Sequence, residues 1–329
     1  MDIFCGMEKA IISRTSQTSN NFVPMWNLDD IYIRESESAV YLVASNNKLV
    51  LYGRKGLCGG GDTLVGISEN DGEIITTGLD GNPIPSNSGI RHIAYTPNFI
   101  YLGLDGARST PSKVAAYEID TNSIAWVQSL PISGGSQIGS LVTDETTVGV
   151  STTQYFLLDA LTGEIKRELD KEPSSSLPSS YGFYALWYAA AHPQAELSTL
   201  EFWNNQTPEI HQPPIVLDDI IVLRTGDGRL LGRVRAFDTQ TNALFWETAP
   251  IVVSNVAVDK SRAYFLTTSA ELIVMDIRTG LITGKIEFAP KNIITESDYG
   301  FYVAAEENNV FIYFGDSQQL FAFHETLGP

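Results

Sequence analysis

Apolar residues along this chain come in short runs that predict β-strands rather than helices. Four such runs, rich in Val, Ile, Tyr, Phe and Thr and separated by polar residues, cover 254–259, 262–267, 272–276 and 282–286. The runs 40–44 and 311–314 are apolar at consecutive positions, which indicates strands buried on both faces of the pleat. The segment 183–197 is a candidate helix, but Pro193 lies inside it, so we interpret it as an irregular insertion or a distorted strand pair. The pattern predicts an all-β protein.

A short phrase recurs seven times and sets the repeat of the predicted fold. Its clearest copies run from Ala236 to Trp246 and from Ala116 to Trp126: a small residue, an acid two positions on, a Thr-Asn or Thr-Gly turn, then tryptophan. Glycine and asparagine tolerate the positive φ that a tight turn between strands requires. The turn positions are Gly72, Asn122, Gly163, Pro208, Asn242, Gly280 and Gly328.

The spacing of these turns predicts the architecture. They lie about 34 to 50 residues apart, about 43 on average, which is the length of one four-stranded propeller blade. We therefore predict a seven-bladed β-propeller of four-stranded antiparallel blades. Pro208 breaks the glycine and asparagine rule of the other turns, so six or eight blades are the alternatives.

The two ends of the repeat predict how the ring closes. The last copy, 322–329, stops at its turn, whereas the segment 22–28 around Trp26 is an outer strand with no repeat before it. An open ring would leave unpaired strand edges on its first and last blades. We predict that this N-terminal strand completes the last blade, within a single domain at 22–329 that follows a flexible tail at 1–21.

The pattern A-x-D-x-x-T-G-x-x-x-W resembles the tryptophan-docking repeat of quinoprotein-like β-propellers, also called PQQ repeats. That group includes quinoprotein alcohol dehydrogenases and a lipoprotein of the outer-membrane β-barrel assembly machinery, and the resemblance covers about residues 22–329. It implies that Trp26, Trp126 and Trp246 dock between neighbouring blades, while the acid and Thr-Gly hold the turn. Gly284 occupies the tryptophan position in a further copy.

The resemblance does not extend to a quinone cofactor. The dehydrogenases of this group are longer, usually have eight blades and a calcium-assisted quinone site, and carry a pair of adjacent cysteines. The two cysteines here, Cys5 and Cys58, are far apart in the sequence. We therefore expect no cofactor and no structural disulfide.

Charge and composition limit the partners. The chain has 39 acidic and 21 basic residues and a net charge of −18, which repels phosphate backbones and anionic membranes, so we expect no nucleic-acid ligand. The longest apolar run, 181–191, is shorter than the roughly 20 residues of a membrane span. Residues 1–21 contain no export signal, so localisation stays open: cytoplasmic as written, exported if a leader is removed. We expect a monomer.

Catalytic and metal-binding motifs are not found. His92, His192, His211 and His324 are scattered, no G-x-S-x-G is present, and the run 59–61 lacks the spacing of a phosphate-binding loop. The segment 69–72 lacks the ligand spacing of a calcium loop, and the acid pairs 29–30 and 218–219 flank strand starts. We assign no catalytic, cofactor-binding or metal-binding residue.

Long loops at 53–62, 103–113 and 173–211 are the candidate working parts, since propellers function through the loops between their strands. The last loop combines a serine-rich stretch with aromatic residues that could form a partner-binding lip or pack the divergent fourth blade: Tyr181, Trp187, Tyr188, Phe202 and Trp203. Two hypotheses follow. The first is a non-enzymatic scaffold that binds a protein or peptide partner through rim loops. The alternative is a channel-site enzyme, or a sensor of a small ligand or metal, whose polar groups converge from several blades.

Overall fold

The computed structural model describes the chain over most of its strands and their connections. The described residues are 21–28, 41–45, 48–54, 62–77, 90–96, 98–106, 110–121, 123–132, 138–143, 146–169, 215–217, 219–226, 232–238, 241, 243–249, 252–288, 301–314 and 319–326. They form strands and turns, with no α-helix among them. Of the predicted tail at 1–21, residues 1–20 lie outside this part of the chain and Asn21 is the first residue of β1.

Six four-stranded antiparallel sheets make up the described structure. The first three contain β2 (Tyr41–Ser45), β3 (Lys48–Arg54), β4 (Asp62–Ser68) and β5 (Ile74–Thr77); β6 (Ile90–Tyr95), β7 (Phe99–Leu104), β8 (Lys113–Glu118) and β9 (Ser123–Ser129); and β10 (Ser140–Thr143), β11 (Thr147–Ser151), β12 (Tyr155–Asp159) and β13 (Ile165–Leu169). The next two contain β14 (Ile215–Leu217), β15 (Ile220–Gly226), β16 (Gly232–Asp238) and β17 (Leu244–Glu247); and β18 (Ala257–Asp259), β19 (Arg262–Leu266), β20 (Glu271–Asp276) and β21 (Ile282–Glu287). The closing sheet contains β22 (Phe301–Glu306), β23 (Asn309–Phe314), β24 (Gln319–Thr326) and β1 (Asn21–Leu28).

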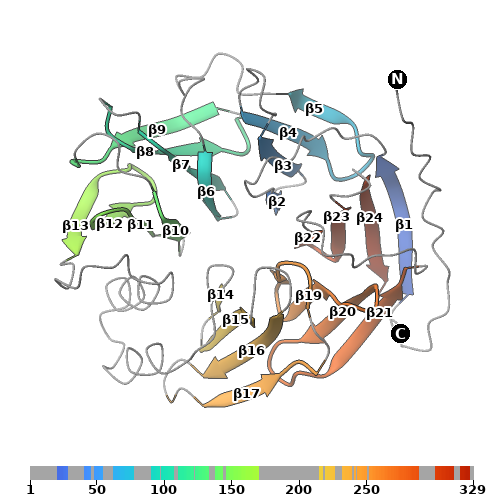
Figure 1. Ribbon diagram of the computed structural model, residues 1–329. Coiled ribbons are helices and arrows are strands. Elements are labelled where there is room, and N and C mark those ends of the chain that lie inside the picture. The colour runs from blue at the N-terminus through green and yellow to red at the C-terminus, as the bar shows by residue number, and fades with distance from the viewer. Residues whose placement is uncertain are drawn as a thin grey trace, which may run out of the picture.

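The sheets stand around a common centre as the blades of a propeller (Figure 1). In the strand order given above, the first strand of each sheet lies nearest the centre and the last lies at the outside, so β22 is the innermost and β1 the outermost strand of the closing sheet (Figure 1). The prediction of seven blades is wrong, because the described residues form six four-stranded sheets. Six of the seven predicted turns correspond to these six sheets. The seventh was inferred at Pro208, where the turn chemistry already departs from the rule, and that position lies outside the described residues.

The closing sheet joins the two ends of the chain. β1 pairs antiparallel with β24, with Asn21 opposite Thr326 and Leu28 opposite Leu320. The N-terminal strand therefore completes the last blade, as the sequence predicted. β24 therefore has a paired strand on each of its edges, β23 and β1, and β1 is the outermost strand of this sheet.

A bulge recurs in all six sheets where the outermost strand meets its neighbour. In five sheets the register shifts by one residue just beside the turn that joins the two strands. In the closing sheet, whose two outer strands come from the two ends of the chain, the shift lies between Pro24 and Trp26. The three tryptophans of the phrase each stand opposite a buried alanine next to this bulge: Trp26 opposite Ala322, Trp126 opposite Ala116 and Trp246 opposite Ala236. A bulge re-aims the side chains beside it, and the alanine methyl leaves room for the indole on the same face of the sheet.

Trp126 shows what the indole does. It projects from β9 onto the next sheet, where its Nε1 donates a hydrogen bond of 3.1 Å to the carbonyl oxygen of Ala160. Its ring lies over Gly163, which has a φ of 73°, so closely that a Cβ on this glycine would lie 2.5 Å from Trp126 Cε3. The turn therefore needs glycine for two reasons, its backbone conformation and the approach of the ring.

The same contact recurs at two other boundaries. In each, an indole nitrogen donates to a carbonyl oxygen and the ring covers a glycine of positive φ in the next sheet: Trp26 to Glu69 at 2.7 Å, over Gly72, and Trp246 to Ile277 at 2.5 Å, over Gly280. Each of these contacts links the outer strand of one sheet to the turn before the outer strand of the next.

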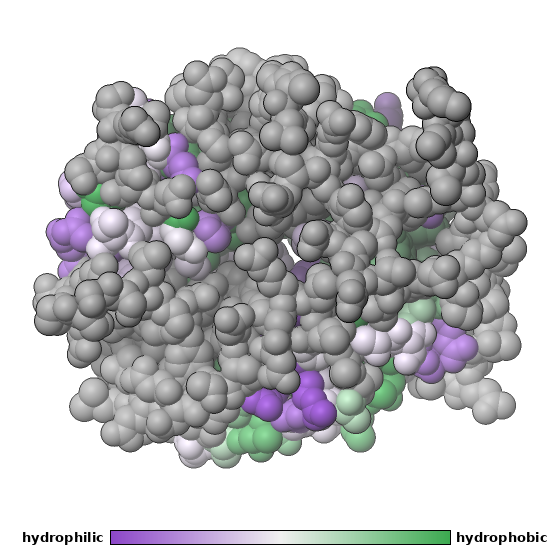
Figure 2. Space-filling model, in the orientation of Figure 1, coloured by the Kyte–Doolittle hydropathy of each residue, from purple (hydrophilic) through white to green (hydrophobic). Residues whose placement is uncertain are grey.

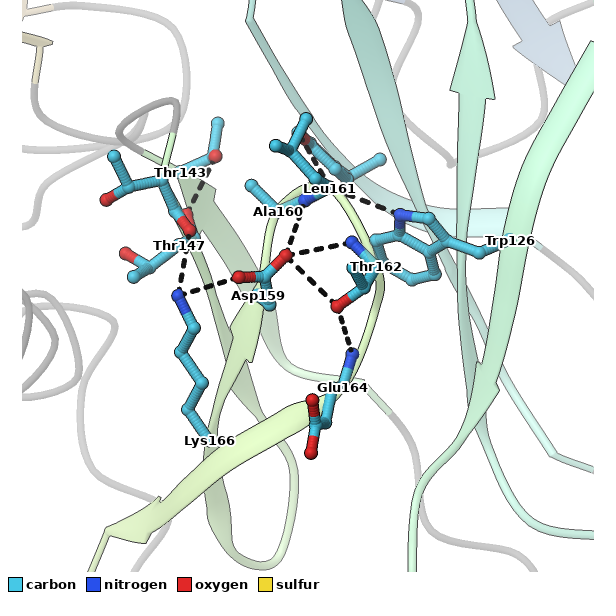
Figure 3. A network of polar contacts seen from close by, with 11 residues as sticks. Trp126, Thr143, Thr147, Asp159, Ala160, Leu161, Thr162, Glu164 and Lys166 are labelled. Atoms are coloured by element: carbon cyan, nitrogen blue, oxygen red, sulfur yellow. Dashed lines mark hydrogen bonds and ion pairs between the residues drawn. The ribbon is translucent and has the colours of Figure 1, made fainter.

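The acid of the phrase organises the turn that receives the ring (Figure 3). Asp159 Oδ1 accepts hydrogen bonds from the backbone nitrogens of Leu161 and Thr162, at 2.9 and 2.8 Å, and from the Thr162 hydroxyl at 3.1 Å. Lys166 Nζ lies 2.8 Å from Asp159 Oδ2, and with the turn's hydrogen bonds it lowers the pKa of Asp159 to about 2. Asp238 and Asp276 bind the backbone and hydroxyl of the threonine three residues on in the same way.

Apolar side chains fill the spaces between neighbouring sheets. Five core clusters of described residues each bridge two sheets, as in the cluster that joins Ile67 to Phe311 across β4 and β23. Middle strands such as β11 are buried along their whole length, whereas β9 alternates between exposed and half-buried residues. The fold thus consists of strands buried on both faces, with outer strands half open to solvent.

Replacing Gly163 by alanine should destabilise the protein by about 2–4 kcal/mol, since the methyl group adds backbone strain and overlaps the Trp126 ring. The matched control is Gly139→Ala, whose new Cβ would lie 3.5 Å from Ser151 Oγ, an ordinary contact. Chemical denaturation measures both. Equal stability of the two variants would contradict the account of the turn.

Truncating Trp26 tests the closure of the ring. Trp26→Ala removes the bond to Glu69 and the contact with Gly72, and we expect it to lower the free energy of unfolding by about 3 kcal/mol. Val23→Ala on the same strand removes a side chain that is 43% exposed and should change it by less than about 0.5 kcal/mol. Thermal unfolding compares them; an unchanged melting temperature for Trp26→Ala would refute the role of this strand.

Candidate functional site

Large apolar side chains are exposed on the outer strand of one sheet and at the turn that leads into the outer strand of the next. On β17, Leu244 is 51% and Phe245 43% exposed, and at the start of β21, Leu281 is 66% and Ile282 50% exposed. We call these four residues the β17/β21 edge. Figure 2 shows apolar side chains at the lower edge of the ring, over these strands, with polar side chains between them.

The docked Trp246 links the two parts of the β17/β21 edge. Trp246 follows Phe245 directly and its ring covers Gly280, which precedes Leu281, so the docking contact joins the two halves of the edge. The register shift between β16 and β17 falls between Trp246 and Leu244, so Phe245 is the extra residue of the bulge. A bulge re-aims the strand, and here the exposed side chains include both Leu244 and Phe245.

Ion pairs surround the β17/β21 edge. Arg278 Nη2 lies 3.0 Å from Asp219 Oδ1 across the two sheets, and Glu247 on β17 binds both Arg233 and Arg235, at 2.6 and 2.8 Å. These pairs are partly exposed, so each contributes little to stability. Exposed apolar and charged side chains therefore occur together on this part of the surface, as they do at protein-binding surfaces.

The aromatic residues predicted to line a partner-binding lip, Tyr181, Trp187, Tyr188, Phe202 and Trp203, lie outside the described residues, and so does most of the loop 53–62. Part of the loop 103–113 is described. There Asp105 Oδ1 accepts a hydrogen bond of 2.9 Å from the backbone nitrogen of Ile138, and the buried Ser112 accepts one of 3.1 Å from Gly106. This loop is therefore tied to the adjoining sheet.

Two of the four histidines singled out in the sequence are described, and they lie on different sheets; His192 and His211 lie outside the described residues. His92 lies on β6 and His324 on β24, where its Nδ1 is 2.8 Å from Asn309 Oδ1. In the described part of the chain no group of three or more His, Cys, Asp or Glu side chains is arranged to hold a metal ion. Within the same residues no helix is long and apolar enough to cross a membrane.

The closing sheet carries a buried polar cluster that the sequence analysis missed. On the side of the β18–β21 sheet, Arg262 Nη1 lies 2.5 Å from Glu325 Oε2, and the Tyr264 hydroxyl donates to the same oxygen at 3.1 Å. Arg262 also donates to Asn308 in the turn between β22 and β23. Burial raises the pKa of the Tyr264 hydroxyl, and the nearby Glu325 carboxylate raises it further. These contacts fix the closing sheet to its neighbour.

On its other side the closing sheet meets Glu69. This residue follows β4, is 1% exposed, and forms a carboxyl pair with Glu306 at the end of β22. Burial raises the pKa of Glu69 to about 9, and the Glu306 carboxyl adds to the effect.

The sequence held a signal for both acids. In other copies of the phrase the same position is apolar and buried: Ile119, Ala160 and Ile277. A glutamate at that position, as at Glu69 and Glu325, therefore indicates a buried charge that needs a partner.

A third buried group is Arg224 on β15. It is 5% exposed, and burial lowers its pKa to about 10, with a small opposing effect from Tyr302 on β22. Arg224 thus lies near the closing sheet although the two belong to sheets that are not adjacent in the ring.

Comparison with known proteins agrees with the fold. A family model described as outer membrane protein assembly factor BamB matches residues 112–323. No curated protein matches the sequence. The WD40 β-propeller domain of Doa1 is similar in structure, with a TM-score of 0.53 and 11% identity over 92% of this chain and 97% of that chain. BamB from Moraxella catarrhalis gives a TM-score of 0.44 and 12% identity over 92% of this chain and 98% of its own.

The likeness to Doa1 shows the propeller fold alone, since the identity is low. The family match carries more, because it covers more than half of the chain. It also confirms the resemblance to PQQ-repeat propellers that the tryptophan phrase indicated. This protein belongs to the PQQ-repeat β-propeller family described as outer membrane protein assembly factor BamB.

Proposed function

We propose that this propeller is a non-enzymatic scaffold that binds a protein partner on its outer rim, and that the β17/β21 edge is part of the contact. The observation that carries the proposal is the exposure of four large apolar side chains, each at least 43% exposed, as two adjacent pairs in neighbouring sheets that the docked Trp246 links. Single exposed apolar residues are ordinary on a protein surface, whereas several large ones on one part of a surface are typical of an interaction site.

The rigidity of this part of the ring supports the proposal. The Trp246 contact fixes β17 against the turn before β21, so a partner meets a preformed surface and little conformational entropy is lost on binding. Full burial of an exposed Leu, Ile or Phe side chain contributes about 1.5–3 kcal/mol, and these four side chains are 43–66% exposed, so each has about half of that to contribute to an interface. Family membership points the same way, since the family is described by an assembly factor.

We extend the proposal to the aromatic loop at 173–211. Tyr181, Trp187, Tyr188, Phe202 and Trp203 supply the rigid, amphipathic side chains that anchor protein interfaces. In this proposal they contact the same partner as the β17/β21 edge.

Site-specific photo-crosslinking in the organism that produces the protein tests the surface. A photoreactive residue at Phe245 or Leu281 should give one adduct of the same mass, and the same residue at Val127, 39% exposed on the outer strand β9, should not. Leu281→Glu should abolish the adduct formed from Phe245, because a charge placed in the apolar centre weakens binding by at least about tenfold. Val127→Glu is the matched control and should leave the adduct unchanged.

Three outcomes would contradict the proposal: no adduct from the edge, equal adducts from Val127, or an adduct with the mass of two copies of this chain. A photoreactive residue at Trp187 or Trp203 tests the loop in the same way. An adduct of different mass there would separate the loop from the partner of the edge.

A further inference from the structure

Glu69 stands at a joint of the ring where its main chain and side chain both cross a sheet boundary. Its carbonyl oxygen accepts the indole hydrogen bond of Trp26 from β1, at 2.7 Å. Its side chain is 1% exposed and points at the turn between β22 and β23 of the closing sheet. One residue therefore carries two contacts between the closing sheet and the β2–β5 sheet.

The groups that face the Glu69 carboxyl are mostly acidic. Glu306 forms a hydrogen bond with it, Glu307 lies within electrostatic range, and the Asn309 side chain also bonds to it. Asn309 in turn contacts His324 on β24. On the turn of Glu69 itself, Asp71 and Glu73 are exposed. No basic side chain in the described structure pairs with Glu69, and its Oε1 has no hydrogen-bond partner.

Two carboxyl groups can form a hydrogen bond only when one of them holds a proton. A Glu69 carboxylate would be repelled by the Glu306 carboxylate beside it, and at 1% exposure it would lack the water that normally solvates it. The burial of Glu69 and the adjacent Glu306 both favour the protonated form. The geometry therefore assigns a proton to this contact.

We propose that the joint between the closing sheet and the β2–β5 sheet is a proton-dependent latch, in which Glu69 donates a shared proton to Glu306 and loss of that proton loosens this joint. The opposite boundary of the closing sheet is built differently. There Glu325 pairs with Arg262, so the contact needs no added proton. As pH rises, the ring therefore opens at the boundary between the closing sheet and the β2–β5 sheet, and not at the boundary with the β18–β21 sheet.

The direction of the effect follows from the two states of Glu69. In the closed ring its pKa is about 9, against 4.5 for an ordinary glutamate in the open or unfolded chain. The contribution of the proton is fully present below pH 4.5 and is lost as pH rises to about 9. Between these limits the opening constant of the joint should rise by up to about tenfold per pH unit.

Hydrogen exchange read by mass spectrometry, corrected for the intrinsic pH dependence of exchange, measures this opening. From pH 6 to pH 9 we expect wild-type peptides of β1 and β4 to lose protection by about tenfold or more per two pH units, while peptides of β17 and β20 change little. Glu69→Gln keeps a hydrogen-bond donor for Glu306 but does not ionise between pH 6 and pH 9. The β1 and β4 peptides of this variant should therefore stay protected. Glu73→Gln, an exposed change in the same turn, should behave as wild type.

The latch is refuted if wild type shows no regional loss of protection, or if Glu69→Gln loses protection as wild type does. Glu306→Gln is a second variant for the same comparison, should Glu69→Gln fold poorly. Calcium is added at pH 9 as a further arm. Restoration of protection by millimolar calcium in wild type but not in Glu69→Gln would show a cation site instead of a shared proton, and would overturn the proposal.

Discussion

The ring is organised by the contact between a tryptophan on one sheet and a glycine turn on the next, and several features of the sequence exist because of it. The indole nitrogen donates a hydrogen bond to a carbonyl oxygen in the turn. The ring lies over a glycine of that turn, at a position where the Cβ of any other residue would overlap it. The alanine opposite each tryptophan makes room on the sheet that provides the ring. The aspartate and threonine hold the turn that receives it. One contact thus accounts for five positions of the repeated phrase: the tryptophan, the glycine, the alanine, the aspartate and the threonine.

The closing sheet differs from the others because it joins both ends of the chain and contains the buried acids. It meets one neighbour through an arginine and the other through a carboxyl pair. Buried ion pairs and carboxyl pairs contribute less to stability than apolar packing of the same volume, so their presence here favours a role in setting or changing the arrangement of the joint. The exposed β17/β21 edge lies on other sheets, which separates the proposed binding surface from the proposed latch.

Much of the fold could be predicted from the sequence, because its determinants are local. The turn residues and the short apolar runs between them predicted the strands and the four-stranded blades. The unmatched strand around Trp26 predicted the closure of the ring. The number of blades could not be predicted in this way, since Pro208 was counted as a turn without the chemistry of one. The predicted lip lies outside the described residues, and the β17/β21 edge was missed because exposure of Leu244 and Leu281 depends on how sheets meet. The buried glutamates were overlooked although they replace an apolar residue of the phrase.

A double-mutant cycle between Trp126 and Gly163 tests the organising contact most directly. If the ring of Trp126 is what excludes a side chain at the turn, Gly163→Ala should cost much less in a Trp126→Ala background, where only the backbone strain of a φ of 73° remains. Denaturant unfolding of the four proteins should give a coupling free energy of at least about 1 kcal/mol. Additive effects of the two substitutions would show that the glycine is needed for its backbone conformation alone, and would contradict the account.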